Sequence, residues 1–170
     1  MKSVVMMGVA GCGKSSAGQA LALTLGLPLI EGDEFHPESN LDKMRQGLPL
    51  TDADRTDWLT ALCHTLEQHP AGAVLTCSAL KRAYRERLRA NAPGLQFVFL
   101  DIDMPTAHQR VSARAGEHLF PPSLVTSQFA TLESPIGEPG VLRVDAAQSL
   151  AHLNDTVAAW LLANAEKDTA

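Results

Sequence analysis

The sequence contains little cysteine, no excess of positive charge and no long apolar run, and each of these shortages excludes a class of protein. Three cysteines occur in 170 residues. They are Cys12, Cys63 and Cys77, an odd number without the paired spacing of a metal site. This usage argues against a disulfide framework and against a zinc site, and it indicates a reducing compartment.

Charge and hydropathy exclude two further kinds of partner. The chain has 14 Lys and Arg against 19 Asp and Glu, a formal net charge of -5, whereas a protein that binds nucleic acid usually has a basic surface. No apolar segment approaches the length of a membrane span. The run after Lys2 breaks at Gly8 and is too short for the apolar core of a signal peptide. We therefore expect a cytoplasmic protein that binds neither nucleic acid nor membranes.

Strand-like apolar runs alternate with helical patterns along the chain, without an internal repeat or a low-complexity segment. The runs lie at residues 3–7, 27–30, 73–77, 95–102 and 141–145. They lack a polar alternation, which is typical of strands buried on both faces. The pattern predicts an α/β fold with a central parallel five-stranded sheet and helices on both faces. A chain of 170 residues with 45% hydrophobic content fits one domain over residues 1–170.

Capping residues and apolar spacing predict the helices. Thr51 and Asp54 have the spacing of a capping box, which would start a long helix. Ser39 or Asn40 is expected to cap a short helix that stops at Gly47. Apolar residues at helical spacing predict core-facing sides on two helices; they are Trp58, Leu62 and Leu66 on the long helix, and Leu150, Leu153, Val157, Trp160 and Leu161 on the last one.

The stretch "GVAGCGKS", Gly8 to Ser15, matches the phosphate-binding pattern G-x-x-x-x-G-K-[ST] and lies between an apolar strand and a helix, as the pattern requires. In such a P-loop the backbone N–H groups and the helix dipole bind phosphate oxygens. Lys14 would reach the β- and γ-phosphates, and the Ser15 hydroxyl would bind Mg²⁺. We therefore expect ATP and Mg²⁺ as cofactors. The predicted nucleotide contacts are Gly8, Val9, Ala10, Gly11, Cys12, Gly13, Lys14, Ser15 and Ser16.

The sequence lacks the marks of nucleotide switches and motors. The patterns D-x-x-G and N-K-x-D are absent, and no acid ends the third strand. The nearest acids are Glu31 and Asp33, after the second strand. Because ligands collect beyond the carboxyl ends of parallel strands, Asp33 is expected opposite the γ-phosphate, where it would accept the proton of an acceptor hydroxyl. Asp33 could instead hold Mg²⁺ through a water molecule, or only shape a turn, and these alternatives stay open.

Residues 114–123, "RAGEHLFPPS", interrupt two helical patterns with a glycine and a proline pair. In a nucleotide-binding enzyme such a loop is expected to be a small lid. Arg114 at its edge is the predicted cation that neutralises charge during phosphoryl transfer. Together with Lys14 and Asp33, it completes the predicted catalytic set of a small-molecule kinase.

Four stretches together resemble the bacterial-type gluconokinases, relatives of shikimate kinase; they are the P-loop, "GDEFHPESNLDKMRQGLPLTDADRTDWL", "CSALKRAYRERLR" and "SQFATLESP". The resemblance covers nearly the whole chain and implies a P-loop kinase fold. It implies ATP-dependent phosphorylation of D-gluconate at its 6-hydroxyl, giving 6-phospho-D-gluconate for carbohydrate acid catabolism. Relatives are commonly dimers, so the resemblance also allows a homodimer.

A site for gluconate needs cations for the carboxylate and both donors and acceptors for the hydroxyls. By similarity to shikimate kinase, Arg55 is expected at the carboxylate and Ser78 at the border of the substrate. Lys81 follows the turn after the third strand and is a further candidate. The predicted substrate contacts are Asp33, His36, Arg55, Ser78, Lys81, Arg85 and Gln128.

Two other functions stay open on the sequence alone, a kinase of another small hydroxy acid such as shikimate and a nucleotide-binding module without turnover. Shikimate fits less well, because no paired D-x-D follows the second strand and no triple glycine follows the third. A module without turnover fits less well because Lys14, Asp33 and Arg114 are all present. Two of the predicted substrate contacts also have structural alternatives. Arg85 would suit the solvated face of its helix, and His36 could serve to shape the turn before Pro37 without contacting the substrate.

Overall fold

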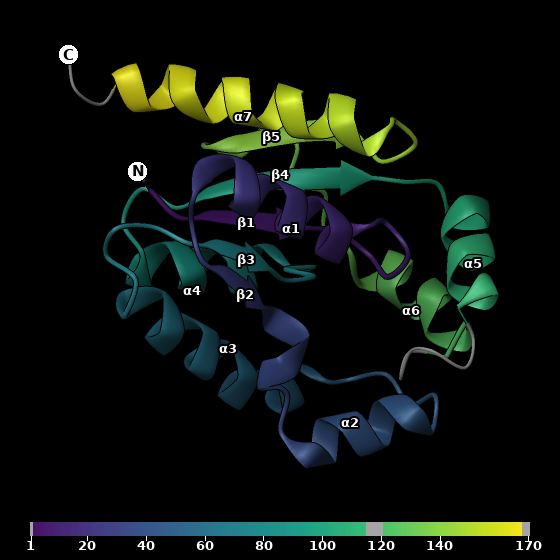
Figure 1. Cartoon of the computed structure of the whole chain (residues 1–170). Coiled ribbons are helices and arrows are strands. Elements are labelled where there is room, and N and C mark those ends of the chain that lie inside the picture. Colours follow the sequence, from purple (N-terminus) through teal and green to yellow (C-terminus); the bar gives the residue numbers. More distant parts are fainter. Residues whose placement is uncertain (1, 115–120, 168–170) are drawn as a thin grey trace.

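The computed structural model describes residues 2–114 and 121–167 and places five strands from these residues in one parallel sheet. They are β1 (Val4–Met7), β2 (Leu29–Glu31), β3 (Val74–Thr76), β4 (Gln96–Asp101) and β5 (Val141–Asp145), in the spatial order β2-β3-β1-β4-β5 (Figure 1). Each strand overlaps one of the predicted apolar runs. The predicted parallel five-stranded sheet is therefore confirmed.

Helices cover both faces of this sheet, as predicted. α1 (Lys14–Leu25) and α7 (Leu150–Lys167) lie on one face, and α3 (Asp52–Glu67) and α4 (Arg82–Asn91) lie on the other (Figure 1). In β1, Val4 and Met6 join the core cluster formed with α1 and α7, whereas Val5 and Met7 join the cluster formed with α3 and α4. Because alternate strand residues point to opposite faces, a sheet covered twice needs apolar residues at every position.

Four shorter elements lie beyond the carboxyl ends of the strands. η1 (Gly32–Phe35) and α2 (Glu38–Arg45) follow β2, and α5 (Met104–Ala113) and α6 (Ser123–Thr131) follow β4. Figure 1 shows α5 beyond the arrowhead of β4 with α6 beside it, and α2 below the segment that leaves β2. Ligands of open parallel sheets bind at this edge, so the fold gathers these elements where a site is expected.

One predicted helix start is confirmed and another is wrong. At the start of α3, the Asp54 N–H donates to Thr51 Oγ1 (3.2 Å) and the Thr51 N–H donates to Asp54 Oδ2 (2.8 Å), which completes the capping box. α2 is instead capped by Pro37, so Ser39 and Asn40 lie inside its first turn. The side-chain nitrogen of Asn40 instead donates to the carbonyl of Asp54 (2.8 Å) in another helix.

The predicted core-facing sides are largely confirmed. Trp58, Leu62 and Leu66 are buried, as are Leu153, Val157 and Leu161; Trp160 is partly buried against the same core. Leu150 is the exception and is 46% exposed, because it is the first residue of α7. Within residues 2–114 and 121–167, no helix combines the length and the apolar character needed to cross a membrane.

The predicted lid, residues 114–123, falls mainly on residues 115–120, which lie outside the described residues. Its two edges are described. Arg114 follows the last residue of α5, and Ser123 is the first residue of α6. The single-domain organisation with a lid stays a prediction.

Asp54 joins the capping box to an ion pair, and this arrangement makes part of the stability depend on pH. Lys43 Nζ lies 2.8 Å from both carboxylate oxygens of Asp54. This hydrogen bond, with that from the Thr51 amide, lowers the pKa of Asp54 from 3.8 to about 2. Because the folded chain lowers this pKa, the contribution of Asp54 to stability is complete above the unfolded value and is lost as the pH falls toward the folded value.

We expect Asp54→Asn to lower the thermal unfolding midpoint at neutral pH, and the difference from the parent protein to shrink as the pH falls from about 5 to about 3. Circular dichroism melting curves across this range measure the difference. Asp42→Asn is the matched control, because it removes an exposed carboxylate paired with Arg45 and should change the midpoint less. A difference that stays constant over the range would contradict the role of Asp54.

Candidate active site

The P-loop joins β1 to α1 and brings a helix N-terminus to the sheet edge. Gly13 has φ 92° and precedes α1 without a side-chain capping bond, so the first amide groups of the helix are left for another acceptor. The Lys14 ammonium folds back over the loop and donates to the carbonyls of Gly8 (3.0 Å) and Val9 (3.1 Å). The Val9 and Cys12 side chains are buried, so these two residues could contact a nucleotide only through their backbone.

A cavity of about 570 Å³ lies where the P-loop, η1, α2, α3, α5 and α6 meet. It brings together most residues predicted for nucleotide and substrate, namely Ala10, Gly11, Gly13, Lys14, Ser15, Ser16, Asp33, His36, Arg55, Ser78, Arg114 and Gln128. Its apolar wall was not predicted and consists of Leu41, Met44, Pro49, Leu50, Trp58, Val111 and Leu124. One cavity therefore contains both a phosphate cradle and a set of polar groups suited to a small acid.

The segment from Glu31 to Asp33 is held at this cavity by close packing against β3. A Cβ on Gly32 would lie 2.1 Å from the carbonyl oxygen of Thr76, so only glycine fits there. The Gly32 N–H donates to Thr76 Oγ1 (3.2 Å), and its carbonyl accepts from Trp58 Nε1 (2.8 Å). With the backbone fixed on both sides, the exposed Asp33 side chain lines the cavity beside the P-loop residues.

Glu31 is a candidate site residue that was not predicted to bind anything. Its Oε2 accepts from Ser15 Oγ (3.1 Å) and from Thr76 Oγ1 (2.6 Å). A hydroxyl and a carboxylate are the hard oxygen groups that Mg²⁺ prefers. Since the described residues contain no group of three His, Cys, Asp or Glu side chains able to hold a metal, a magnesium ion here would take its other ligands from phosphate and water.

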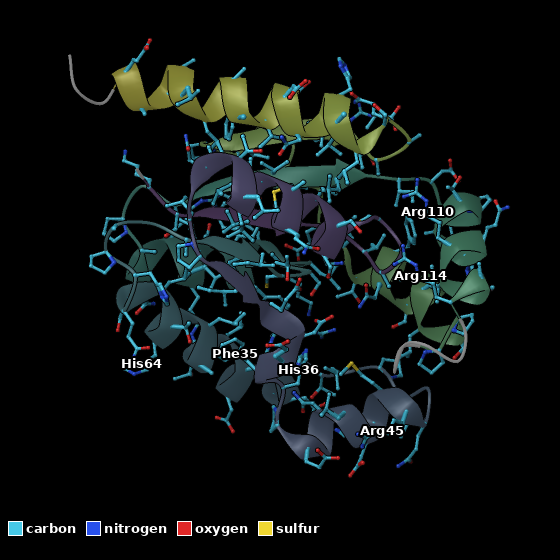
Figure 2. All side chains as sticks on the ribbon, viewed as in Figure 1. Phe35, His36, Arg45, His64, Arg110 and Arg114 are labelled. Carbon is cyan, nitrogen blue, oxygen red and sulfur yellow. The ribbon has the colours of Figure 1, made fainter. Side chains whose placement is uncertain are left out.

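His36 lies at the end of η1 (Figure 2), and its ring is stacked on the indole of Trp58. The ring centroids are 4.4 Å apart and the planes differ by 13°. Asn40 Nδ2 lies 3.2 Å from His36 Nδ1. Burial lowers the pKa of His36 below its ordinary value of 6.5; the carboxylate of Asp33 opposes this shift and the guanidinium of Arg55 supports it. This shift favours the neutral form of the His36 ring, which lines the cavity.

Arg55 is a cation that the fold holds in a fixed orientation at the cavity wall. Its guanidinium donates to the carbonyl of Leu50 (2.6 Å) and to the hydroxyl of Tyr84 (3.5 Å), and it lies 5.7 Å from the centre of the Tyr84 ring. Only 8% of Arg55 is exposed. These contacts fix the orientation of the guanidinium, while its place in the cavity lining leaves part of the fork for a ligand.

Lys81 and Arg85 do not reach the cavity. The Lys81 ammonium donates to both carboxylate oxygens of Asp52 (2.8 and 3.0 Å), and this contact lowers the pKa of Asp52 and raises that of Lys81. Arg85 is fully buried and donates to Glu138 and to the carbonyls of Ala79 (2.8 Å) and Leu80 (3.1 Å). The structure therefore corrects the predicted substrate role of Arg85, whose donors are taken up by the protein itself.

The buried Arg85 instead supports the turn that carries Ser78 to the cavity. Ala79 has φ 46°, the one positive value found for a non-glycine residue in the described chain. Such a conformation costs free energy and persists only when neighbouring contacts hold it. The hydrogen bond from Arg85 to the Ala79 carbonyl is such a contact, so Arg85 acts on the site through the turn.

Two side chains attach the outer helices to the P-loop. The Ala10 N–H donates to Gln128 Oε1 (2.8 Å), so only the NH₂ end of this amide is left for a substrate. Arg110 was not predicted; it donates to the carbonyls of Gly11 (3.3 Å) and Ala146 (3.1 Å). Figure 2 shows Arg110 and Arg114 projecting from the α5 side toward the P-loop. Arg110 and Arg114 are one helical turn apart, and this spacing could have indicated that Arg110 lies on the same side of the helix as the predicted Arg114.

Comparisons with known proteins show the family of this chain. A protein-family model described as an AAA domain matches residues 4–136. The chain is 50% identical over 145 residues to a gluconokinase of Gluconobacter oxydans, over 83% of this chain and 80% of the relative. It is 39% identical over 158 residues to the thermosensitive gluconokinase of Escherichia coli, over 91% and 84% of the two chains. The crystal structure of a gluconokinase from Sinorhizobium meliloti matches with a TM-score of 0.89 and 47% identity, over 98% of this chain and 94% of that one. With such identity over most of both sequences, the chain belongs to the gluconokinase family.

Proposed function

We propose that the protein transfers the γ-phosphoryl group of ATP to the 6-hydroxyl of D-gluconate, giving ADP and 6-phospho-D-gluconate. The observation that carries this proposal is the single cavity that joins the P-loop to Asp33 and Arg55. Relatives named gluconokinase supply the identity of the acid. The apolar wall and the volume of about 570 Å³ suit the two ligands lying end to end.

The P-loop side of the cavity would bind the nucleotide. The amides before and within the first turn of α1 would bind phosphate oxygens, and Lys14 would exchange its bonds to Gly8 and Val9 for the β- and γ-phosphates. Ser15, with Glu31 behind it, would hold Mg²⁺. When bound, this ion neutralises negative charge on the phosphates.

The opposite side of the cavity would bind gluconate. Arg55 would pair with the carboxylate through its planar fork, and His36, Ser78 and Gln128 would bond to hydroxyl groups. Asp33 would accept the proton of the 6-hydroxyl as its oxygen forms a bond to the γ-phosphorus and the bond to the β-phosphate oxygen breaks. Arg114 would stabilise the charge that spreads over the transferred group.

The same geometry favours turnover over passive nucleotide binding, because Asp33 and Arg55 line the cavity but are not needed to hold phosphate. A cytoplasmic location, expected from the cysteine usage and the short apolar runs, and a homodimer, allowed by the family resemblance, are part of this proposal. A kinase of another small hydroxy acid is the alternative within the same chemistry, and the choice of substrates below separates the two.

The first prediction concerns the substrate. We expect ATP-dependent ADP release with D-gluconate and little with shikimate, glycerate or nucleoside monophosphates, because Arg55 and the hydroxyl-binding groups match an open-chain polyol acid. A coupled ADP assay with the full chain measures this. Turnover of shikimate or a nucleotide, with none of gluconate, would overturn the proposal.

The second prediction concerns Asp33. We expect Asp33→Asn to lower kcat by about 10² or more, because the acceptor proton loses its base, while ATP affinity changes little. Steady-state kinetics and nucleotide titration measure the two effects. Glu34→Gln, the next carboxylate in η1 and not part of the cavity lining, is the matched control and should keep most of the activity. Unchanged turnover in Asp33→Asn would show a structural role only.

The third prediction concerns Glu31. We expect Glu31→Gln to raise the Mg²⁺ concentration for half-maximal activity by about tenfold or more, because loss of a group that orients a metal ligand typically weakens metal binding to that extent. Nucleotide affinity measured without Mg²⁺ should remain near the parent value. An unaltered Mg²⁺ requirement would place Glu31 outside the metal environment.

A further inference from the structure

We propose that Asn40 is a positioning residue that fixes the tautomer of His36, so that His36 presents an Nε2–H donor to the substrate. The assignment of a donor and its orienting partner deepens the function proposed above, and it relies on that function only for the identity of the acceptor. Asn40 is 2% exposed and lies in the first turn of α2, and its amide cannot reach solvent.

The direction of the Asn40 amide follows from its partners. One terminal atom of the amide lies 2.8 Å from the backbone carbonyl of Asp54. A carbonyl can only accept, so this atom must be the NH₂ nitrogen. The same nitrogen lies 3.2 Å from His36 Nδ1. Its second hydrogen is therefore directed at the ring, and His36 Nδ1 must accept.

If Nδ1 accepts a hydrogen bond, the position of the ring proton is determined. A neutral histidine carries one proton, so it must be on Nε2 when Nδ1 accepts. A protonated ring would direct an Nδ1–H at the NH₂ of Asn40, donor against donor. The lowered pKa of His36, which results mainly from burial, agrees with the neutral form.

The donor is directed to the cavity that the substrate would occupy. His36 lines this cavity, and within the described residues no hydrogen bond uses its Nε2. The stacked Trp58 restricts rotation of the ring, and the indole N–H is already donated to the Gly32 carbonyl. The Nε2–H group of His36 therefore remains available to donate to a ligand in the cavity.

The tautomer matters because Asp33 lines the same cavity. A hydroxyl that accepts from Nε2–H keeps its own hydrogen for a second partner, which a carboxylate can accept. With the proton on Nδ1, His36 would itself be an acceptor and would compete with Asp33 for that hydrogen. Asn40 thus separates the roles of donor and acceptor between two neighbouring side chains.

Nitrogen-15 NMR of the imidazole groups in the full chain tests the proposal directly, because it distinguishes a protonated from an unprotonated ring nitrogen. His36→Gln identifies the signals of His36 among the six histidines. We expect the neutral Nε2–H form in the parent protein above the His36 pKa. A neutral Nδ1–H form there would overturn the proposal, and the tautomer itself is read from the parent protein.

Asn40→Asp keeps the size of the side chain but offers an acceptor to Nδ1. We expect it to move the proton to Nδ1, to raise KM for gluconate about tenfold through the lost donor, and to leave KM for ATP little changed. Gln68→Glu is the matched control, because the Gln68 amide nitrogen likewise contacts a histidine ring, at Nε2 of the exposed His64 on α3 (3.0 Å); it should alter neither His36 nor KM. A His36 tautomer unchanged in Asn40→Asp would also overturn the proposal. If the protein instead fails to phosphorylate gluconate, the NMR result still decides the role of Asn40.

Discussion

The packing of Gly32 against β3 is the constraint on which the proposed chemistry depends. The hydroxyl of Thr76 accepts from the Gly32 amide and donates to Glu31, so one β3 side chain holds both the backbone and the first acid of the segment. Trp58 donates to the carbonyl of Gly32 and so holds the next peptide unit. The carboxylates of Glu31 and Asp33, two residues apart, thereby have different surroundings. Glu31 accepts from Ser15, and Asp33 lines the cavity. Nothing larger than a hydrogen atom fits on Gly32, because the sheet occupies the space.

Several cationic side chains lie near the part of the cavity proposed to bind gluconate. Ion pairs within the protein determine which of them can bind a ligand. Lys81 is paired with Asp52, and Arg85 is paired with Glu138. Burial alone would raise the pKa of Glu138, but the hydrogen bonds from Arg85 and Arg89 outweigh it and lower this pKa. A buried cation without such partners would be costly. Arg55 differs because, within the described residues, its hydrogen-bond partners are a carbonyl and a phenol and no carboxylate accepts from its guanidinium directly.

Local sequence signals predicted the sheet, the P-loop, the capping box of α3 and most of the cavity residues. These features depend on neighbours in sequence or on the rule that parallel strands end at a common edge. What could not be predicted depends on contacts between distant residues. Glu31 meets Thr76 across 45 positions, and Arg85 meets Glu138 across 53. The charge of Arg85 suited a solvated helix face equally well, and only the fold shows that this face is turned inward.

The left-handed backbone conformation of Ala79 restricts which residues this position can accept. The residue is fully buried, which excludes larger side chains, and its positive φ strains any residue that carries a Cβ. Glycine is the substitution compatible with both demands. Two neighbouring residues of the turn after β3 therefore differ in what they tolerate. Ser78 lines the cavity without this backbone strain, whereas the buried and strained Ala79 is a fixed spacer that keeps the preceding side chain at the cavity wall.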